Sequence, residues 1–366
     1  MRVAVYPADQ YGCGHHRLIW PSQELINAGH DIDLVTPKNR HLRLSVDNRN
    51  DTIVDVDLPD GVDVIVLQRV THRYLAEVVP IIRAKDVAVV IDVDDDLAAI
   101  HPANPAWHDL HPNRKDHVVD AQPRKHSWHN LADACRAATL VTTTTPALQR
   151  RYAPHGRGVV LPNYLAEHYY GVDHEDNDVV GWPASLHSHP DDPAAVGNAI
   201  QRLVHDGARF RVASQSPGVG AAFGLVDDDQ VELSDYNIEL LDWPAELTKI
   251  GIGVAPLADT RFNAGKSWLK ALELAAVGVP WVASPREDYS RLHKLGCGLL
   301  VEKPKAWYAV LRDLLRSETR RRELSDAGRV VAEQLRLANH AWRWWEAWDH
   351  ALGLQRRRDV AQVVVG

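Results

Sequence analysis

The sequence predicts an α/β protein built from two doubly wound, Rossmann-like domains in tandem. Strand and helix patterns alternate along the 366 residues, which is the order that produces a parallel sheet with helices on both faces. The alternation begins again at residues 174–192, with a new first strand and a new loop. The length is also sufficient for two well-buried cores. We expect domains at 1–166 and 174–338, followed by a C-terminal helical segment at 339–366.

The first domain opens with the strand "RVAVYPA" at residues 2–8. The glycine-bearing turn "YGCGHHR" then leads into a helix that ends near Gly29. Helical patterns separate the buried apolar runs that follow, which gives a βαβ arrangement. These runs predict strands at 31–35, 62–69, 87–97, 139–143 and 158–161.

The second domain opens with the strand "VVGW" and repeats the pattern. Its other strands are expected at "RFRVASQ", "QVELSDY", "IGIGVAPL", "WVAS" and "CGLLVE", and a further helix starts near Lys305. The segment "HAWRWWEAWDHALGLQRR" predicts a C-terminal helix whose four tryptophans need a surface to bury against. Open α/β sheets bind ligands at the carboxyl ends of their strands, so we expect a ligand cleft between the two sheets.

The composition is that of a soluble globular chain, with 45% apolar and 25% charged residues. No apolar run approaches the roughly 20 residues that a membrane span needs, and "MRVAVYPADQ" lacks the features of a secretory signal. The three cysteines are odd in number and widely spaced, which predicts free thiols in a reducing compartment rather than disulfides or a zinc site. We therefore expect a cytoplasmic protein, whose oligomeric state is left open.

Charge is distributed unevenly along the chain, although the net charge is −8. Residues 107–157 hold eight Lys/Arg, four Asp/Glu and six histidines, whereas residues 167–259 hold four Lys/Arg and seventeen Asp/Glu. One interpretation is that both stretches are solvated faces. The other is that the basic stretch contacts a polyanionic partner.

The segment "FNAGKSWLKALELAAVGVPWVAS" (262–284) places Lys266, Lys270 and Glu273 at i, i+4 and i+7, along one side of a predicted helix that stops at Gly278. The helix follows a strand and a loop, so its N-terminus points its N–H groups at the expected cleft. A diphosphate fits beside Lys266 with Lys270 in support, and Glu273 can accept hydrogen bonds from a ribose diol. The alternative is a surface helix with a Lys–Glu pair worth roughly 0.2–0.5 kcal/mol.

This segment resembles the donor-site signature of GT-B glycosyltransferases, the two-Rossmann-domain enzymes, of the family-4-like sort often encoded by phages and actinobacteria. Weaker similarities are spread over most of the chain, in "YGCGHHRLIWPSQELINAGHDIDLV", "VVLPNYL" and "VVGWPASLHSHPDD". The resemblance implies transfer of a sugar from a nucleotide-diphosphate sugar to an acceptor hydroxyl, with neither a metal nor another cofactor. It also implies that the C-terminal helix crosses back onto the first domain.

In that family, the lysine matching Lys266 binds the donor diphosphate and the glutamate matching Glu273 binds the ribose. Gly265 stands where the family usually has another glutamate. The loop "GWPASLHSH" replaces the Arg and Lys that often follow the first strand of the second domain. The residues of the signature expected to bind the donor are Asn263, Ala264, Gly265, Ser267, Lys270 and Glu273, and Lys266 is expected to be catalytic.

Two loops supply further donor-site candidates. In "GCGHHR", Gly12 and Gly14 would let the backbone approach sugar or phosphate, and His15 and Arg17 are the donor-site candidates beside them. His16, in the same turn, is a candidate for a catalytic role. A structural role is the alternative for the two histidines. In "SLHSHPDD" we expect Ser185 and His187 to contact phosphate or sugar; a metal site that includes His189 and Asp191 is the weaker alternative.

The cluster "DVDDDL" (92–97) ends a predicted strand with four carboxylates, whose crowding should raise at least one pKa. Asp94 and Asp95 are candidates for binding acceptor hydroxyls or acting as a base. The alternatives are cation binding and a helix-capping role for Asp95 or Asp96. His101, just beyond, is expected to hydrogen-bond the transferred sugar.

The acceptor is the least defined part of this hypothesis. The basic stretch 107–157 suits DNA carrying hydroxymethylated bases, which related phage enzymes glycosylate, and it would equally suit a lipid phosphate or a protein. The nucleotide-sugar donor is the other expected partner. A nucleotide-sugar epimerase and a binding scaffold without turnover are the alternatives to a transferase.

Overall fold

The computed structural model describes residues 1–36, 42–110, 127–172, 174–214, 217–226, 230–234 and 238–365, with side chains up to residue 357. The chain divides into two compact units. The first comprises Met1–Ala99, Ala106–Asn163 and Leu337–Gly366, and the second comprises Ile100–Pro105 and Tyr164–Arg336. Within the described residues, none of the helices combines the length and apolar character that crossing a membrane requires.

The first unit is built on a six-stranded, fully parallel sheet with the order β2-β1-β5-β6-β7-β8. Every residue of β5 and β6 is buried, as expected for strands that helices cover on both faces. The predicted strands of this domain are confirmed, with shorter bounds. They are β1 (Val3–Tyr6), β2 (Ile32–Leu34), β5 (Val64–Gln68), β6 (Ala88–Val93), β7 (Leu140–Thr143) and β8 (Gly158–Val160).

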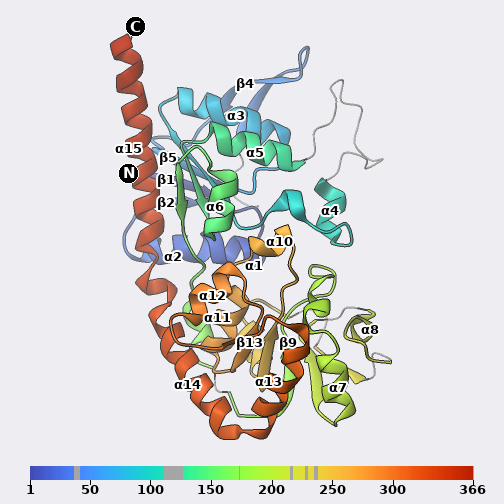
Figure 1. Ribbon diagram of the computed structural model, residues 1–366. Helices are drawn as coiled ribbons and strands as arrows, with labels where there is room; N and C mark the ends of the chain where they lie inside the picture. The colour runs from blue at the N-terminus through green and yellow to red at the C-terminus, as the bar shows by residue number, and fades with distance from the viewer. Residues whose placement is uncertain are drawn as a thin grey trace. The chain divides into compact units, whose positions relative to one another are not determined.

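Helices cover both faces of this sheet, as Figure 1 shows. The helices α2 and α15 pack together on one face, and α3 and α5 pack together on the other. The helical elements of this unit are α2 (Trp20–Asn27), α3 (Arg73–Ala84), η2 (Leu97–Ala99), α4 (Pro105–Leu110), α5 (Ser127–Ala137), α6 (Pro146–Tyr152), η6 (Leu337–Asn339) and α15 (Trp342–Val365).

The expected aromatic C-terminal helix is α15, which contacts β5, β6 and α2. Trp344 and Trp348 are fully buried there, and the Trp344 indole donates a hydrogen bond to the Arg17 carbonyl at 2.8 Å. Trp342 points away and is half exposed. Two of the four tryptophans therefore anchor the helix on the apolar face of the first sheet.

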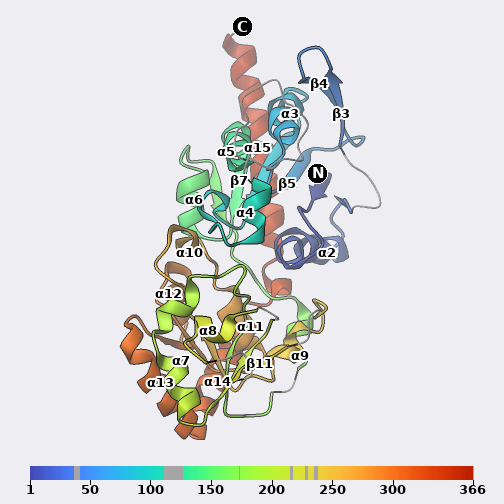
Figure 2. The ribbon, with the colours of Figure 1, turned by 90° about the vertical axis from the view of Figure 1, so that its right-hand side faces the viewer.

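Two parts of the first unit differ from the sequence-based expectations. The glycine-bearing turn is helical: α1 (Gly12–Gly14) and the π-helical turn η1 (His15–Ile19) run directly into α2. This helix starts early because the Asp9 carboxylate accepts the N–H groups of Tyr11 and Gly14. In addition, an antiparallel hairpin that no pattern predicted, β3 (Arg43–Asp47) and β4 (Thr52–Asp57), packs against α3 (Figure 2).

The second unit also has a six-stranded, fully parallel sheet, with the order β11-β10-β9-β12-β13-β14. Written in chain order this is 3-2-1-4-5-6, the arrangement of dinucleotide-binding sheets. The strands predicted for this domain are confirmed. They are β9 (Val179–Trp182), β10 (Arg209–Val212), β11 (Glu232–Leu233), β12 (Ile252–Ala255), β13 (Trp281–Ala283) and β14 (Leu299–Leu300).

Helices α7 and α13 pack together over one side of this second sheet, around a core that contains Trp182, Phe210, Phe223 and Trp307. Helix α11 contacts β12 and β13 and packs against α14 and α9. The helical elements are η3 (Glu167–Tyr169), η4 (Asp192–Val196), α7 (Ala199–His205), α8 (Val219–Ala222), α9 (Trp243–Leu247), α10 (Arg261–Ala264), α11 (Leu269–Ala276), α12 (Glu287–His293), α13 (Pro304–Arg316) and α14 (Glu318–Gln334).

The chain reverses its direction of travel across each sheet at one point. In the first unit this point lies between β1 and β5, and in the second it lies between β9 and β12. The loops that leave the two strands there diverge, which opens a crevice outside the carboxyl ends where ligands of doubly wound sheets bind. A ligand site is therefore expected among the residues of these four loops.

Candidate functional site

The loops after β9 and β12 bring four polar side chains into one chain of contacts in the second unit. Lys270 Nζ lies 3.0 Å from His189 Nε2, and His189 Nδ1 lies 2.8 Å from Asp192 Oδ2. Asp192 Oδ1 accepts hydrogen bonds from Asn263 Nδ2 at 2.6 Å and from the Ala258 N–H at 3.0 Å. Because His189, Asp192 and Asn263 are all buried, this chain connects the interior of the unit to Lys270.

Lys270 contacts the His189 imidazole, and Lys266 is near enough to act on it electrostatically. Burial and then Lys270 lower the pKa of His189 to about 3, and Lys266 acts in the same direction. Lys266 Nζ also lies over the Phe262 ring, 4.3 Å from its centroid. His189 is therefore neutral at physiological pH, and the positive charges of both lysines converge at the β9/β12 switch point.

The predicted helix begins later than the sequence indicated, so the placement of Lys266 in its first turn is wrong. Helix α11 starts at Leu269, and Lys266 lies in the turn between α10 and α11. The Trp268 N–H donates to Asp288 Oδ2 at 2.8 Å, which fixes the start of the helix. The end is as expected, since Gly278 has a φ of +84°, the left-handed conformation typical of a residue that follows a helix.

Glu273 is buried, with 6% of its surface exposed, rather than open to a ligand. Its Oε1 accepts a hydrogen bond from the Tyr169 hydroxyl at 2.7 Å, and the Trp243 side chain donates a second hydrogen bond to the carboxylate. Burial raises the pKa of Glu273 to about 7. In this structure the carboxylate joins α11 to η3 and α9, a role that the sequence did not indicate.

The remaining donor-site candidates of the β9 loop and the signature have local backbone contacts. Ser185 Oγ accepts the His187 N–H at 3.3 Å, and the His187 side chain is exposed. Ser267 Oγ accepts the Leu269 N–H at 3.4 Å at the start of α11. Of this loop, it is His189 rather than His187 that turns inward to the lysines.

Three more candidates differ in exposure and partners. Ala264 is exposed and Gly265 is buried, so the two neighbours present different surfaces. His101 falls in the second unit, where its Nε2 lies 3.8 Å from Asp191 Oδ1. Its Nδ1 accepts the Ala103 N–H at 3.0 Å. His101 is 43% exposed, which leaves much of its imidazole accessible.

In the first unit, Gly14 serves packing rather than ligand approach. A Cβ atom at Gly14 would lie 1.9 Å from the Asp9 carbonyl oxygen, so only glycine fits. Gly12 is different, because a Cβ atom there would meet nothing within 4 Å. His15 Nδ1 lies 2.9 Å from the Tyr11 carbonyl oxygen.

Arg17 does not line a cleft, contrary to the sequence-based expectation. Its guanidinium is 1% exposed and forms an ion pair with the fully buried Asp92 at 2.8 Å. It also donates to the Leu161 carbonyl at 2.6 Å and to Asn163 Oδ1 at 3.0 Å. The helical conformation of the segment turns Arg17 inward. His16 is buried as well, edge-on to the neighbouring indole of Trp20.

Cations accompany the aspartates of "DVDDDL". Asp94 receives two hydrogen bonds of 2.5 Å from Arg69, and Asp95 lies 3.6 Å from the same guanidinium. Burial alone would raise the pKa of Asp94, but Arg69 holds it below its usual value. Asp96 contacts Arg151 at 3.0 Å, and burial raises its pKa. The expected raised pKa therefore occurs at Asp96, although burial rather than crowding is its cause.

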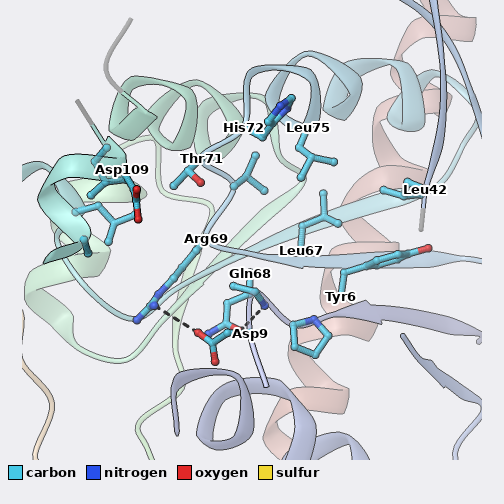
Figure 3. A pocket seen from close by; sticks show the side chains of 16 residues that line it. Tyr6, Asp9, Leu42, Leu67, Gln68, Arg69, Thr71, His72, Leu75 and Asp109 are labelled. Carbon is cyan, nitrogen blue, oxygen red and sulfur yellow. Dashed lines mark hydrogen bonds and ion pairs between the residues drawn. The ribbon is translucent and has the colours of Figure 1, made fainter. Parts of the chain in front are cut away.

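A cavity of about 490 Å³ opens at the β1/β5 switch point of the first unit (Figure 3). Arg69 extends along one side of the cavity toward Asp9, with 3.7 Å between their charged atoms, and Leu67 and Leu75 line another side. Arg69 has a φ of +49°, a strained conformation for a non-glycine residue that places its side chain at this edge. The other labelled lining residues are Tyr6, Leu42, Gln68, Thr71, His72 and Asp109.

Solved structures share the architecture of the whole chain. The sucrose-phosphate synthase of Thermosynechococcus elongatus is 14% identical, with a TM-score of 0.58 over 98% of this chain and 99% of its own. A glycosyltransferase from Rickettsia africae is 11% identical, with a TM-score of 0.57 over 96% and 98%. HepE of Anabaena, solved in complex with UDP, is 13% identical, with a TM-score of 0.54 over 79% of each chain.

The chain has the GT-B fold. Its two parallel six-stranded sheets and C-terminal helices match this fold, as the sequence resemblance implied. No protein-family model and no curated protein matches the sequence.

Sequence reasoning missed the residues that contact the candidate side chains in both units. Arg69 directly follows the buried strand β5, and a charged residue at that position is a signal that could have been used. Asp192 and Tyr169 carried no comparable signal, since their contacts join residues far apart in the chain. Within the described residues, no group of His, Cys, Asp and Glu has the arrangement of a metal site.

The buried carboxylate of Glu273 predicts a pH-dependent stability. In the unfolded chain its pKa is near 4.5, and in the folded chain it is near 7. Between these values the unfolded state has released the proton that the folded state retains, so rising pH favours unfolding. Glu273 therefore lowers the free energy of unfolding by as much as about 3 kcal/mol at pH 8. We expect Glu273→Gln to remove this loss of stability. Urea unfolding of both proteins at pH 5, 6.5 and 8 measures it.

The exposed Glu302 supplies the control, because Glu302→Gln makes the same chemical change outside the core. The stability of Glu273→Gln is still expected to fall somewhat as the pH rises, because burial also raises the pKa of Asp288, to about 6. Parallel pH profiles of wild type and Glu273→Gln would show that Glu273 is ionised in the folded protein at neutral pH.

Proposed function

We propose that the protein is a glycosyltransferase that takes a sugar from a nucleoside-diphosphate sugar and passes it to an acceptor hydroxyl. The observation that carries this proposal is the convergence of Lys266 and Lys270 at the β9/β12 switch point. Two cations at this edge suit a diphosphate, whose negative charge grows as the sugar leaves. HepE has the same fold and was solved with UDP, which supports a uridine nucleotide as the donor.

In this proposal, residues 174–338 bind the donor, residues 1–166 bind the acceptor, and the segment 339–366 completes the acceptor domain. Lys266 stabilises the leaving diphosphate, with Lys270 and Ser267 beside it. The buried Asn263 and Gly265 support the donor site from within, Asn263 through its hydrogen bond to Asp192. The proposed acceptor site is the 490 Å³ cavity of the first unit. Asp95 does not line the cavity, but it lies 3.6 Å from the lining residue Arg69. It is better suited than Asp94 to accept a proton beside the cavity, because Asp94 is doubly hydrogen-bonded to Arg69.

The sequence suggested hydroxymethylated DNA, as in a phage enzyme, as one acceptor. Four of the eight cations in 107–157 belong to residues 111–126, which lie outside the described residues. Of the other four, Arg136 pairs with Asp133, Arg151 pairs with Asp96, and Arg157 donates to backbone carbonyls. The fourth, Arg150, is exposed. The described part of this stretch therefore offers little support for DNA as the acceptor. The cavity better supports an acceptor that presents a small, uncharged hydroxyl group, on a protein, a lipid or a glycan.

The test is release of nucleoside diphosphate from UDP- and GDP-sugars, with and without each of three acceptors. These are a duplex containing hydroxymethylcytosine, a neutral oligosaccharide and a serine-rich peptide. We expect acceptor-dependent release whose rate changes little between 50 and 200 mM salt. A DNA acceptor would instead give a rate that falls steeply as the salt concentration rises. The affinity for DNA falls about 10³-fold or more over this range when the protein makes six or more phosphate contacts.

Other outcomes would assign the fold a different activity. Conversion of the donor sugar without any acceptor would identify an epimerase. Failure to bind or turn over any of the nucleotide sugars would reject the transferase and leave a binding scaffold.

A further inference from the structure

We propose that His189 is a positioning residue that fixes Lys270 for contact with the donor diphosphate. The proposal rests on the proposed transferase function and identifies how its second cation is held. Lys270 Nζ lies 3.0 Å from His189 Nε2, and Nδ1 on the other side of the ring lies 2.8 Å from Asp192. The imidazole therefore stands between a buried carboxylate and the lysine.

The sequence of the loop after β9 explains why Lys270 needs a contact that positions it. Residues 183–198, which follow β9, contain neither Lys nor Arg, so this side of the switch point has no cation of its own. Lys270 comes from α11, on the other side of the switch point, and is only partly buried. A long, flexible lysine chain loses conformational freedom when it holds a ligand, and a prior contact reduces that cost.

The tautomer of His189 follows from its surroundings. The Asp192 carboxylate lies 2.8 Å from Nδ1 without the angle of a hydrogen bond. Its negative charge still favours the proton of the neutral ring on Nδ1, so Nε2 accepts an N–H of Lys270. Asp192 is itself fixed by Asn263 and by the Ala258 N–H. This buried support orients the ring in the same way that outer partners orient a metal-bound histidine. Because the imidazole is neutral, it does not offset the positive charge of the lysine.

The experiment compares the dissociation constants of UDP, GDP and ADP with those of uridine, guanosine and adenosine, by calorimetry. The variants are His189→Leu, which removes the acceptor, and His189→Gln, whose amide can still accept from Lys270 and donate to Asp192. Lys270→Met and the double variant with His189→Leu complete the cycle. Lys294→Met, at an exposed position just after α12, is the control for loss of one positive charge.

We expect His189→Leu to weaken binding of the preferred nucleoside diphosphate about tenfold while the affinity for its nucleoside is unchanged. Lys270→Met should have the same effect, and the double variant should lose no more than either single one. His189→Gln should stay within about threefold of wild type, because it retains both contacts.

Three results separate the failures. Wild type that binds none of the diphosphates overturns the proposed function together with this inference. Unchanged diphosphate binding in His189→Leu, or additive losses in the double variant, overturns only the role of His189. Equal weakening of diphosphate and nucleoside in both His189 variants also overturns it, because it would show a general disturbance of the fold.

Discussion

Lys266→Ala is expected to lower kcat/KM for nucleoside-diphosphate release by about 10²–10³-fold, the usual effect of removing one preorganised group that stabilises transition-state charge. Lys266 is half-buried, lies over Phe262 and acts on His189, so its charge sits at the switch point of the donor unit. Charge on the diphosphate is greatest as the glycosidic bond breaks. The loss should therefore be larger in kcat than in the affinity for the product nucleotide.

Steady-state release assays with the best donor, together with calorimetric affinities for the nucleoside diphosphate, measure the two quantities. Lys294→Ala removes a lysine from an exposed position and should leave both unchanged. Lys266→Arg keeps the charge and should recover part of the loss. Activity of Lys266→Ala within threefold of wild type would remove Lys266 from the proposed mechanism.

Arg17→Met is expected to destabilise the first unit by about 3–5 kcal/mol, because it leaves Asp92 buried without its counter-charge. Asp92 is fully buried, and its other described hydrogen bond comes from the Thr142 hydroxyl at 2.7 Å. The substitution also removes the donors to Leu161 and Asn163, where the chain leaves this unit. The site proposed for the donor lies in the other unit and should keep its nucleotide affinity.

Urea unfolding followed by tryptophan fluorescence measures the stability, and calorimetry measures nucleotide binding. The double variant Arg17→Met, Asp92→Leu removes both charges and should be considerably more stable than Arg17→Met alone. If Arg17 binds the donor, as the sequence suggested, Arg17→Met would instead weaken nucleotide binding without a large loss of stability.

The fold could be predicted from the sequence because its main signals are local. Buried strands such as β5 and β6 are continuous apolar runs, and their alternation with helical patterns specifies a doubly wound sheet. The β3–β4 hairpin escaped prediction because its burial depends on α3, a contact between distant parts of the chain. The start of a helix was also missed where a distant carboxylate fixes it. Asp288 does this for α11.

The candidate site was predictable in its residue types and less so in their partners. The spacing of Lys266 and Lys270 identified the segment, and in the structure Lys270 contacts His189 while Lys266 acts on it electrostatically. Nothing local distinguished the buried Arg17 from an exposed one, because its partner Asp92 lies 75 residues away. Glu273 likewise carries a local signal for ligand binding, whereas its contact with Tyr169 is visible only in three dimensions.

The course of the chain has a consequence for the order in which the protein is made. Helix α15 covers β5 and β6, strands that lie within the first 93 residues, while the second unit consists almost entirely of the continuous stretch Tyr164–Arg336. During synthesis the second unit can complete its core before α15 is made. The apolar face of the first sheet stays exposed until the residues of α15 have left the ribosome. A fragment that stops at residue 336 would lack α15, and its first sheet would keep an exposed apolar face.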